Sequence, residues 1–470
     1  MTNPYITIFL LIMQRREFTR LSSWFLLGLG LTQCANNPQS STPESSSKSS
    51  DELSIWWQQG FYPEETDALA QIISEWEKET GIKVSLEIIP QKDILKEIES
   101  AIASGKTPDI FYAGVADLTI IPRLAWNNQL ADVSEVIDPL EDLYSESVLA
   151  GVNYQNQVAN KRGYYAVPIM QSAIHIHYWQ DLLNKMGQDQ ESIPKDWEGF
   201  WQFWEEAQEQ LPKSGQPDMY SMGMPMSLSL DTYNNFEQFL EAYDVELLDE
   251  KGKLQVDDPQ VRQGIANAIE NYASFYQNGT VPPEAVDWDN TGNNVALLSR
   301  TSLMTVNHTL SAPGSQRQDK DVYYNQLSTV KWPNKPSGEP MRFVVEIKQA
   351  VIFKASENQE SAKSFLSYLA QPENLEAYVE GAQGRYLPVM PQLFEKPFWQ
   401  NPEDPHISVA VEQLQKTRPA YQVFNPAYGE VAAQNVWGEV MRKIAVDDLS
   451  TEQATEEAIE QIKQIFADWT

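Results

Sequence analysis

Histidine is the side chain best suited to both metal binding and acid–base chemistry near neutral pH. This chain has four, His175, His177, His308 and His406, and none stands in an HExxH motif or a Cys/His spacing typical of zinc sites. His175 and His177 alternate along a predicted strand, so they share one face and are placed to hold a metal. A packed or hydrogen-bonded pair is the simpler interpretation. We therefore predict no metal and no cofactor.

Motifs of covalent and nucleotide chemistry are not found in the sequence. It has no Gly-x-Ser-x-Gly elbow, no Walker loop and no dinucleotide-binding glycine fingerprint. With 66 acidic residues, a glycosidase-like pair of carboxylates stays open as an alternative, although no spacing marks out one pair. We predict that the protein is not an enzyme.

Aromatic, amide and charged side chains offer a different chemistry, that of ligand binding. The chain has 14 Trp and 20 Tyr, several of them at the ends of predicted strands. Flat apolar rings pack against the C–H faces of a sugar, while amides and carboxylates hydrogen-bond its hydroxyl groups. By position, the candidate ligand-binding residues are Trp57, Gln58, Gln59, Tyr112, Asp117, Gln171, Asn235, Trp288, Asn307, Glu346 and Arg385. Asp109, beside a turn, is interpreted as a cap of backbone N–H groups.

The stretch around residues 94–113 indicates the scaffold that positions these side chains. Apolar residues recur at helical spacing from Ile94 to Ile102, and Gly105 suits the left-handed position just past a helix end. The residues Ile110–Tyr112 then form a short buried strand. Together with the predicted strands 53–57 and 84–89 and the helix 67–78, this order predicts βαβ units whose strand ends face a crevice.

The order of these elements resembles that of the extracellular solute-binding proteins of ABC importers, and most closely their saccharide-binding, maltose-binding-protein-like branch. The resemblance rests on the sequences of residues 79–84 and 104–109, and continues through 193–200, 303–307 and 384–389. It covers roughly residues 52–470. It implies an α/β, two-lobed periplasmic-binding-protein fold of type II, in which each lobe is a sheet flanked by helices and hinge segments join the lobes.

The resemblance also implies the division of the chain. Residues 52–167 with 347–380 form the first lobe, and residues 168–346 with 381–470 form the second. The chain crosses near Val167–Pro168 and near Val345–Glu346, and returns to the second lobe near Gly384. Pro168 must end its strand or place it at a sheet edge, because proline lacks the N–H that a ladder requires.

The first 51 residues read as an export signal and a tether. Basic residues precede an apolar run, Trp24–Leu31, that is too short to span a bilayer, as in a signal peptide over residues 1–33. The sequence Leu31–Cys34 resembles a lipobox, which implies acylation of Cys34. Residues 34–51 are then a flexible linker rich in Ser, Asn and Pro. The first twelve residues are nearly uncharged, and the true start is Met13 in our interpretation.

Length and charge limit the partners. A chain of 470 residues exceeds one ordinary core, so at least two lobes are expected. The formal charge is −32, and removing a leader of net charge about +2 leaves about −34. A field of this sign repels nucleic acid and anionic lipid headgroups. We therefore expect no nucleic-acid partner, membrane attachment through the lipid anchor only, and a monomer.

These observations predict an exported lipoprotein, periplasmic or at the cell surface, that captures a neutral sugar or oligosaccharide between two lobes and delivers it to the membrane subunits of an ABC permease. Rings such as Trp57 are expected to be half exposed before the ligand arrives. The alternatives are a secreted glycoside hydrolase or lyase, and a receptor for a non-saccharide solute such as a polyamine, a peptide or a phosphodiester.

Overall fold

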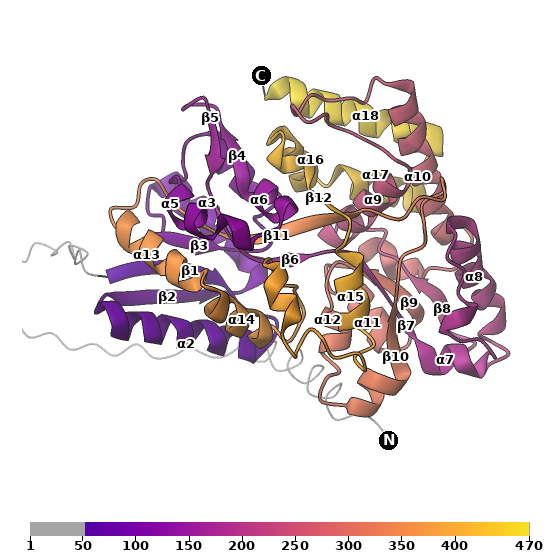
Figure 1. The fold of residues 1–470 in the computed structure, drawn as a ribbon. Coiled ribbons are helices and arrows are strands. Elements are labelled where there is room, and N and C mark those ends of the chain that lie inside the picture. Colours follow the sequence, from indigo (N-terminus) through magenta and orange to yellow (C-terminus); the bar gives the residue numbers. More distant parts are fainter. Residues whose placement is uncertain (1–51, 470) are drawn as a thin grey trace, which may run out of the picture. The chain divides into compact units, whose positions relative to one another are not determined.

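The structure is a computed structural model that describes residues 52–469. The expected leader, the linker and Cys34 lie outside the described residues. Two main sheets, each with helices packed around it, make up the described chain (Figure 1). This is the expected α/β architecture.

The first sheet contains six strands in the order β12-β11-β3-β1-β2, with β6 paired to β11. Its strand β1 runs parallel to both β2 and β3, which is the pairing that the predicted βαβ order requires. The long strand β11 pairs antiparallel with β3 and β6 and parallel with β12. The strands are β1 (Glu52–Gln58), β2 (Lys83–Ile89), β3 (Ile110–Tyr112), β6 (Val167–Ser172), β11 (Phe343–Ile352) and β12 (Thr417–Pro419).

The helices of this half include the two crossovers of the βαβ units, α2 and α3. Gly81 and Gly105 end these helices with φ of +77° and +66°, the left-handed conformation that glycine adopts without strain. Trp76 of α2 is buried, as expected of a core residue. The helices are α2 (Pro63–Thr80), α3 (Gln91–Ser104), α4 (Ile120–Trp126), α5 (Ser134–Ile137), η1 (Asp138–Leu143), α6 (Glu146–Val152), α13 (Gln359–Leu369) and α14 (Pro372–Gly381).

The second sheet has four strands in the order β10-β7-β9-β8, with β7 antiparallel to β9 and β10, and β8 parallel to β9. Its strands are β7 (His175–Trp179), β8 (Tyr220–Gly223), β9 (Ser302–Asn307) and β10 (Leu327–Val330). A separate hairpin joins β4 (Asn153–Asn156) to β5 (Lys161–Tyr164).

Helices of the later chain surround the second sheet. Asp196 caps α8 by accepting a hydrogen bond from the Gly199 amide at 2.9 Å, as its position before an aromatic run predicts. The longer helices are α7 (Gln180–Lys185), α8 (Trp197–Gln210), α9 (Leu230–Ala242), α10 (Pro259–Gln277), α11 (Gly292–Leu298), α15 (Ile407–Gln413), α16 (Ala427–Ala433), α17 (Val436–Asp447) and α18 (Thr451–Asp468). The shorter ones are η2 (Gln190–Ser192), η3 (Pro283–Asp287), α12 (Ser311–Gly314), the π-helical turn η4 (Val322–Gln326), η5 (Pro391–Glu395) and η6 (Tyr421–Val423).

The expectation for Pro168 is confirmed in its second form. Pro168 does not end its strand, because β6 continues through it to Ser172, but β6 pairs with no other strand of the described chain than β11 and so lies at an edge of the first sheet. The register of this pair shifts between Lys348 and Gln349, and Pro168 stands opposite Gln349 at that irregularity. At an irregularity of this kind the ladder of hydrogen bonds is interrupted, so a proline, which has no N–H to donate, is accommodated there.

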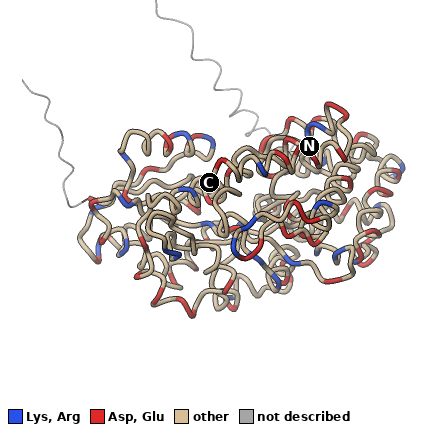
Figure 2. Tube along the Cα trace, turned by 90° about the horizontal axis from the view of Figure 1, so that it is seen from above, with Lys and Arg blue, Asp and Glu red and all other residues tan. Residues whose placement is uncertain are grey.

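Acidic residues outnumber basic ones along the described trace, and both kinds are spread over it (Figure 2). Asp109 behaves as expected, since its carboxylate accepts hydrogen bonds from the Ser54 amide at 2.8 Å and the Ser356 hydroxyl at 2.6 Å. It therefore ties the start of β1 to the loop after β11.

Candidate functional site

The candidate site lies where the ends of β1 and β3 and the middle of β11 meet the segments that follow β9 and open α9. Trp57 and Tyr112 stand opposite each other in the register of β1 and β3, and their rings stack with centroids 4.2 Å apart. Trp57 Nε1 donates to the Tyr378 hydroxyl at 2.8 Å. Only 1% of Trp57 is exposed, so the expected half-exposed ring is instead enclosed by other rings.

Arg385 is buried beside this aromatic group. Its guanidinium lies 4.6 Å from the Tyr386 ring and 4.9 Å from the Phe61 ring, and 3.9 Å from the carboxylate of Glu65. Burial raises the pKa of Glu65, while the nearby Arg385 charge opposes that rise. Glu65 also accepts a hydrogen bond from the Phe61 amide at 3.1 Å. A planar cation on an aromatic face is thus fixed here with its Nε left without a hydrogen-bond partner.

A chain of charged groups continues from there along β11. Lys348 Nζ lies 2.5 Å from Glu346, 3.7 Å from Asp117 and 3.3 Å from the Gly114 carbonyl oxygen. Burial raises the pKa of Asp117 well above its usual range, against the effect of Lys348. Burial lowers the pKa of His308 to about 4, so at pH 7 its ring is neutral and its Nδ1 lies 3.3 Å from Glu346. The amino group of Lys348 thus lies between two buried carboxyl groups, those of Glu346 and Asp117.

Two candidates of the second half of the chain, Asn307 and Trp288, lie at the end of β9 and before α11. Asn307 ends β9 and donates to the side chain of Asn294, while its own oxygen accepts from the Thr309 amide at 2.9 Å. Trp288 is half-buried against Gly292, where a Cβ atom would lie 2.4 Å from the tryptophan. Glycine at position 292 is therefore required for the ring to occupy this place.

The first turns of α9 add a carboxyl and an amide. Loss of solvent raises the pKa of Asp231 to about 7, although its hydrogen bond with Asn293 and the charge of Arg385 favour the ionised form. Asn235, one turn further along α9, is fully buried beside Tyr272.

The three candidate glutamines have separate environments. Gln58 is buried with its side-chain oxygen unpaired, and Gln59 is exposed. Gln171 donates to the Pro388 carbonyl at 2.6 Å and exchanges backbone hydrogen bonds with Leu387, so it ties β6 to the segment after Arg385.

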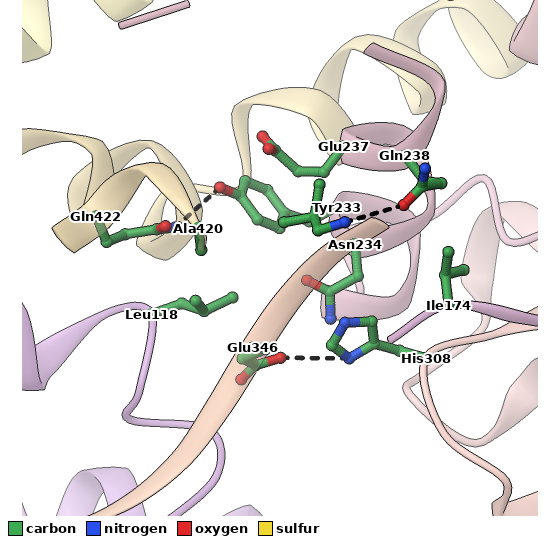
Figure 3. Close-up of a pocket in the computed structure, with 11 residues that line it drawn as sticks. Leu118, Ile174, Tyr233, Asn234, Glu237, Gln238, His308, Glu346, Ala420 and Gln422 are labelled. Atoms are coloured by element: carbon green, nitrogen blue, oxygen red, sulfur yellow. Dashed lines mark hydrogen bonds and ion pairs between the residues drawn. The ribbon is translucent and has the colours of Figure 1, made fainter. Parts of the chain in front are cut away.

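A small cavity of about 20 Å³, room for little more than one water molecule, lies beside these groups in this arrangement of the two halves. Figure 3 shows Glu346 and His308 paired on one side, with Asn234 pointing toward the histidine from α9. Tyr233 accepts a hydrogen bond from Gln422 at 3.1 Å on the other side. The remaining lining residues are Leu118, Ile174, Glu237, Gln238, Val344 and Ala420. The cavity therefore takes its wall from segments on either side of β11.

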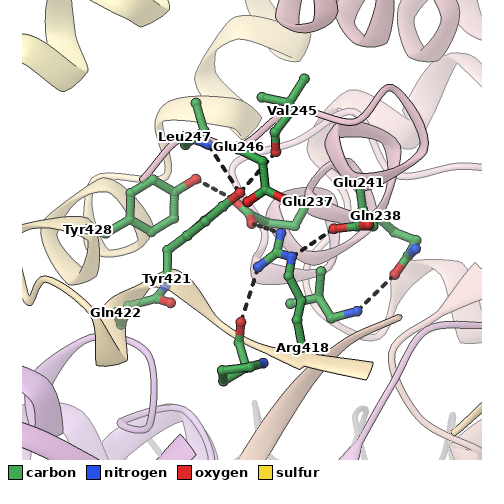
Figure 4. A network of polar contacts seen from close by, with 12 residues as sticks. Glu237, Gln238, Glu241, Val245, Glu246, Leu247, Arg418, Tyr421, Gln422 and Tyr428 are labelled. Carbon is green, nitrogen blue, oxygen red and sulfur yellow. Dashed lines mark hydrogen bonds and ion pairs between the residues drawn. The ribbon is translucent and has the colours of Figure 1, made fainter. Parts of the chain in front are cut away.

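A polar network behind this cavity fixes α9 against two strands of the first sheet (Figure 4). Arg418 of β12 donates to Glu241 at 2.8 Å and lies 4.0 Å from Glu237. The pKa of Glu241 is lowered to about 2, because the favourable effects of Arg418 and other cations outweigh its burial. The side-chain amide of Gln238 donates to the Arg342 carbonyl and accepts from the Val344 amide. It thus pairs with the backbone at the start of β11 in the way that a neighbouring strand would. Helix α9 is thereby held at a fixed position relative to β11 and β12.

Comparison with known proteins agrees with this architecture. The sequence profile of a family described as bacterial extracellular solute-binding protein matches residues 71–408. The chain belongs to this family. A curated relative, "Putative ABC transporter periplasmic-binding protein YcjN" of Escherichia coli (strain K12), is 20% identical over 411 residues, which cover 84% of this chain and 89% of the relative.

Solved structures confirm the two-lobed fold of this family member. An ABC transporter solute-binding protein from Thermotoga lettingae, bound with α-D-tagatose, superposes with a TM-score of 0.71 at 18% identity, covering 88% of this chain and 99% of that one. Maltose-bound MalE3 of T. maritima gives 0.69 at 17% identity, with 88% and 100% covered. The cyclic α-maltosyl-1,6-maltose binding protein from Arthrobacter globiformis gives 0.67 at 18% identity, with 88% and 98% covered.

In this family member, the structure groups some candidates and separates others. Trp57, Tyr112 and Arg385 belong to one aromatic and cationic group, and Asp117 with Glu346 to the adjoining charged chain. The cation of Lys348 joins the two groups, at 5.7 Å from the Tyr386 ring. The other six candidates lie outside these two groups: Gln58, Gln59, Gln171, Asn235, Trp288 and Asn307.

Several residues of the site were not among the sequence candidates. They are Glu65, Asp231, Tyr233, Asn234, His308, Lys348, Tyr378, Tyr386 and Gln422. His308 and Lys348 stand next to candidates on the same segments, so the neighbourhood was indicated although the residue was not. Tyr378 comes from the middle of α14, and only the tertiary packing of that helix on α2 brings it near Trp57.

The described residues contain no group of three or more His, Cys, Asp or Glu side chains arranged to hold a metal ion. His177 and His406 instead hydrogen-bond to the hydroxyl of Thr329, at 2.8 and 2.7 Å. Within residues 52–469, no helix combines the length and the apolarity needed to cross a bilayer.

Proposed function

We propose that this chain is the substrate-binding component of an ABC importer and that it captures a neutral sugar or oligosaccharide between its two lobes. The observation that carries the proposal is the mixture of side chains at the meeting of the two halves. Rings, amides and buried carboxylates stand there together, and hydroxyl-rich ligands require this combination. The sugar ligands named for the structural neighbours above support the same class.

The charge of the site favours a neutral ligand. Four carboxyl groups, those of Glu65, Asp117, Asp231 and Glu346, stand with the two cations of Lys348 and Arg385. Burial raises the pKa of Glu65, Asp117 and Asp231 and so reduces their negative charge, which leaves no large excess of either sign. A phosphodiester would bring a further negative charge to this group, at a Coulombic cost. A neutral sugar needs only the acceptors that the carboxylates already offer.

Calorimetric titration of the purified protein tests the proposal. The panel consists of maltose, maltotetraose and tagatose, with spermidine as the cationic control. Saturable binding of a sugar without any product in the recovered ligand supports the proposal. Cleavage of the sugar would instead support a glycoside hydrolase or lyase, and saturable binding of spermidine alone would overturn the saccharide assignment.

The division into lobes is proposed with the boundaries inferred from the sequence: residues 52–167 with 347–380, and residues 168–346 with 381–470. Strand β6 continues in the first sheet to Ser172, and β12 lies in that sheet as well. Segments 168–172 and 417–419 therefore act as joints between the two halves.

Export and anchoring are part of the same proposal. The leader and the Leu31–Cys34 sequence support acylation of Cys34, attachment of the monomer to the membrane by its lipid alone, and docking to two permease subunits. Labelled palmitate should be incorporated by the wild-type chain in a bacterial host and lost in Cys34→Ser, with sugar binding intact. Equal labelling of Cys34→Ser would contradict the lipoprotein assignment.

A further inference from the structure

A second cavity lies away from the candidate site, on the outer part of the second half of the chain. It is a groove of about 750 Å³, and we call it the α8–α10 groove after the two helices that form its walls. Trp197, Trp201 and Phe275 line its floor, and the segment from Lys335 to Gly338 closes one end. It shares no residue with the cavity in Figure 3.

The walls of the groove carry one sign of charge. Asp196, Glu198 and Glu205 come from α8 and its cap, and Glu270 comes from α10. None of these four carboxylates takes part in a salt bridge within residues 52–469. The groove is therefore negative and its charges are not balanced from within the described chain.

The single cation that lines the groove is already neutralised. Lys335 is buried, and its amino group lies 2.8 Å from Glu241 and 2.7 Å from Asp244. These two carboxylates neutralise its charge, and they do not line the groove. The positive charge that complements the walls must therefore come from a ligand.

Hydrogen-bonding groups stand among the carboxylates. Asn271 on α10 accepts from Trp197 Nε1 at 2.9 Å and from the Tyr243 hydroxyl at 3.2 Å, which leaves its side-chain NH₂ group free to donate. Trp201 Nε1 on the floor is buried without a hydrogen-bond partner. Donors of this kind match the carbonyl oxygens of a peptide backbone.

The floor is apolar but does not present ring faces. Trp197 is 6% exposed and Trp201 is 3% exposed, so only the edges of these rings reach the groove. Stacking on the C–H face of a sugar needs an accessible ring face. The apolar floor, the donors and the carboxylate walls together fit a peptide better than a second sugar.

We propose that the α8–α10 groove binds a cationic peptide segment, one that bears Lys or Arg side chains and belongs to a partner protein. Carboxylates on both walls pair with the basic side chains, and the backbone of the segment lies along the apolar floor. Charge complementarity of this type sets orientation and association rate as well as affinity. The proposal is independent of the sugar assignment, since the groove lies outside the candidate site.

A matched pair of double variants tests it. Glu198→Gln with Glu270→Gln removes one unpaired carboxylate from each wall of the groove. Glu452→Gln with Glu460→Gln removes two exposed and equally unpaired carboxylates from α18. Both doubles change the net charge by the same amount, and none of the four side chains caps a helix. Thermal melts confirm that both variants are folded.

The probe is hexalysine, titrated at low ionic strength with hexaglutamate and maltohexaose as comparison ligands. We expect the groove double to bind hexalysine at least about fivefold more weakly than the wild type, and the α18 double to stay within about twofold, since exposed ion pairs contribute about 0.2–1 kcal/mol each. Equal weakening in both doubles, or no binding by the wild type, overturns the proposal. Tighter binding of hexaglutamate or maltohexaose also overturns it. The affinity of the wild type for hexalysine should fall as the salt concentration is raised, and the affinity of the groove double variant should fall less. This result supports the proposal.

Discussion

At the scale of single residues, burial decides what the histidines do. His175, His177 and His406 are buried in one cluster with ring centroids 6.2–6.3 Å apart, and His308 lies near them. Burial lowers the pKa of His177 and His406 to about 3 and that of His308 to about 4, and lowers the pKa of His175 well below its usual range. The metal-binding alternative considered for His175 and His177 has no support in this arrangement.

These pKa values predict acid sensitivity. The unfolded chain takes up protons on histidine below about pH 6.5 and the folded chain does not until about pH 3–4, so stability falls as pH drops through this window. Above pH 6.5 the histidines contribute nothing to the pH dependence. The raised pKa of Asp231, about 7, and the raised pKa values of the buried Glu65, Asp117 and Glu237 act in the opposite direction. Denaturant unfolding at pH 7, 6 and 5 measures the net slope.

The contribution of one histidine is isolated by His406→Asn. Its Nδ1 bonds to the Thr329 hydroxyl at 2.7 Å, a contact that the shorter asparagine amide can keep, while the bond from Nε2 to the Tyr323 carbonyl is lost. The variant should lose stability less steeply on acidification, by up to about 1.4 kcal/mol per pH unit between pH 6 and 5. Proton–nitrogen spectra of the imidazoles provide the check. A wild-type His406 that titrates near pH 6.5 would contradict the prediction.

Two tryptophans separate packing from ligand contact. Trp57→Ala should cost about 3–5 kcal/mol of stability, because the ring is enclosed and hydrogen-bonded to Tyr378. Trp288→Ala should leave stability closer to the wild type and reduce sugar affinity by roughly 5- to 150-fold, because among the candidate rings Trp288 is partly exposed, whereas Trp57 and Tyr112 are buried. Trp76→Ala, in the core of α2, is the matched control for lost packing.

Thermal melts and calorimetric titrations distinguish the three variants. Trp57→Ala and Trp76→Ala should melt early, and Trp288→Ala should lose binding first. Normal sugar binding by a folded Trp288→Ala would remove this residue from the site.

At the scale of elements, α9 is fixed by charge rather than by apolar packing alone. Glu241 is 1% exposed and accepts hydrogen bonds from Lys335, Arg342 and Arg418, which come from a loop, the segment before β11, and β12. The helix that lines the cavity is therefore tied to the strands that pass between the two halves. Loss of one cation leaves a buried carboxylate with less compensation.

Arg418→Met tests this joint. We expect a loss of about 3 kcal/mol of stability, at the lower end for a broken buried pair because Lys335 and Arg342 remain beside Glu241. The control is Lys331→Met, which breaks the exposed pair with Glu412 and should cost less than about 1 kcal/mol. Denaturant unfolding of both variants gives the comparison. Equal costs would show that the network around Glu241 is not a special joint.

The elements themselves were largely predictable from local patterns. Helical spacing from Ile94 to Ile102 and the left-handed Gly105 predicted α3 and its end. The buried strand Ile110–Tyr112 predicted β3 with its bounds, and Asp196 predicted the start of α8. The course of β6 was not predictable, because its passage through Pro168 depends on a bulge in β11, a strand nearly 180 residues away in the chain. Local rules contain no information about such a partner.

At the scale of the whole molecule, the same limit explains which part of the site the sequence could indicate. Strand ends are visible in a sequence, and so Trp57, Tyr112 and Asn307 were chosen. The partners that define their environments, Tyr378 and Asn294, lie on helices that reach them only through tertiary packing. Whether a ring at a strand end is enclosed or open to a ligand depends on those helices.

Contacts between the two halves also exist at the rim of the site. The loop between β1 and α2 reaches α12, where the Tyr62 hydroxyl donates to the Ser311 carbonyl at 3.0 Å, and Arg385 approaches Glu65 of α2. Gly314 permits this approach, since a Cβ atom there would lie 2.4 Å from the Tyr62 oxygen. These contacts form only when the halves are close together.

Ligand should therefore compact the molecule. A sugar that bridges both walls binds the closed arrangement better than an open one, and so shifts the population toward it and raises the melting temperature by mass action. Solution scattering should show a smaller radius of gyration at saturating sugar.

Tyr62→Phe removes one hydrogen bond of the closed arrangement, worth about 0.5–1.5 kcal/mol, and should weaken sugar binding by roughly 2- to 12-fold without changing the stability of either half. Tyr324→Phe, at an exposed ring away from the rim, is the control and should bind as the wild type does. A scattering profile that stays the same at saturating sugar would show that binding does not depend on closure, and the contact between Tyr62 and Ser311 would then be a static part of the fold.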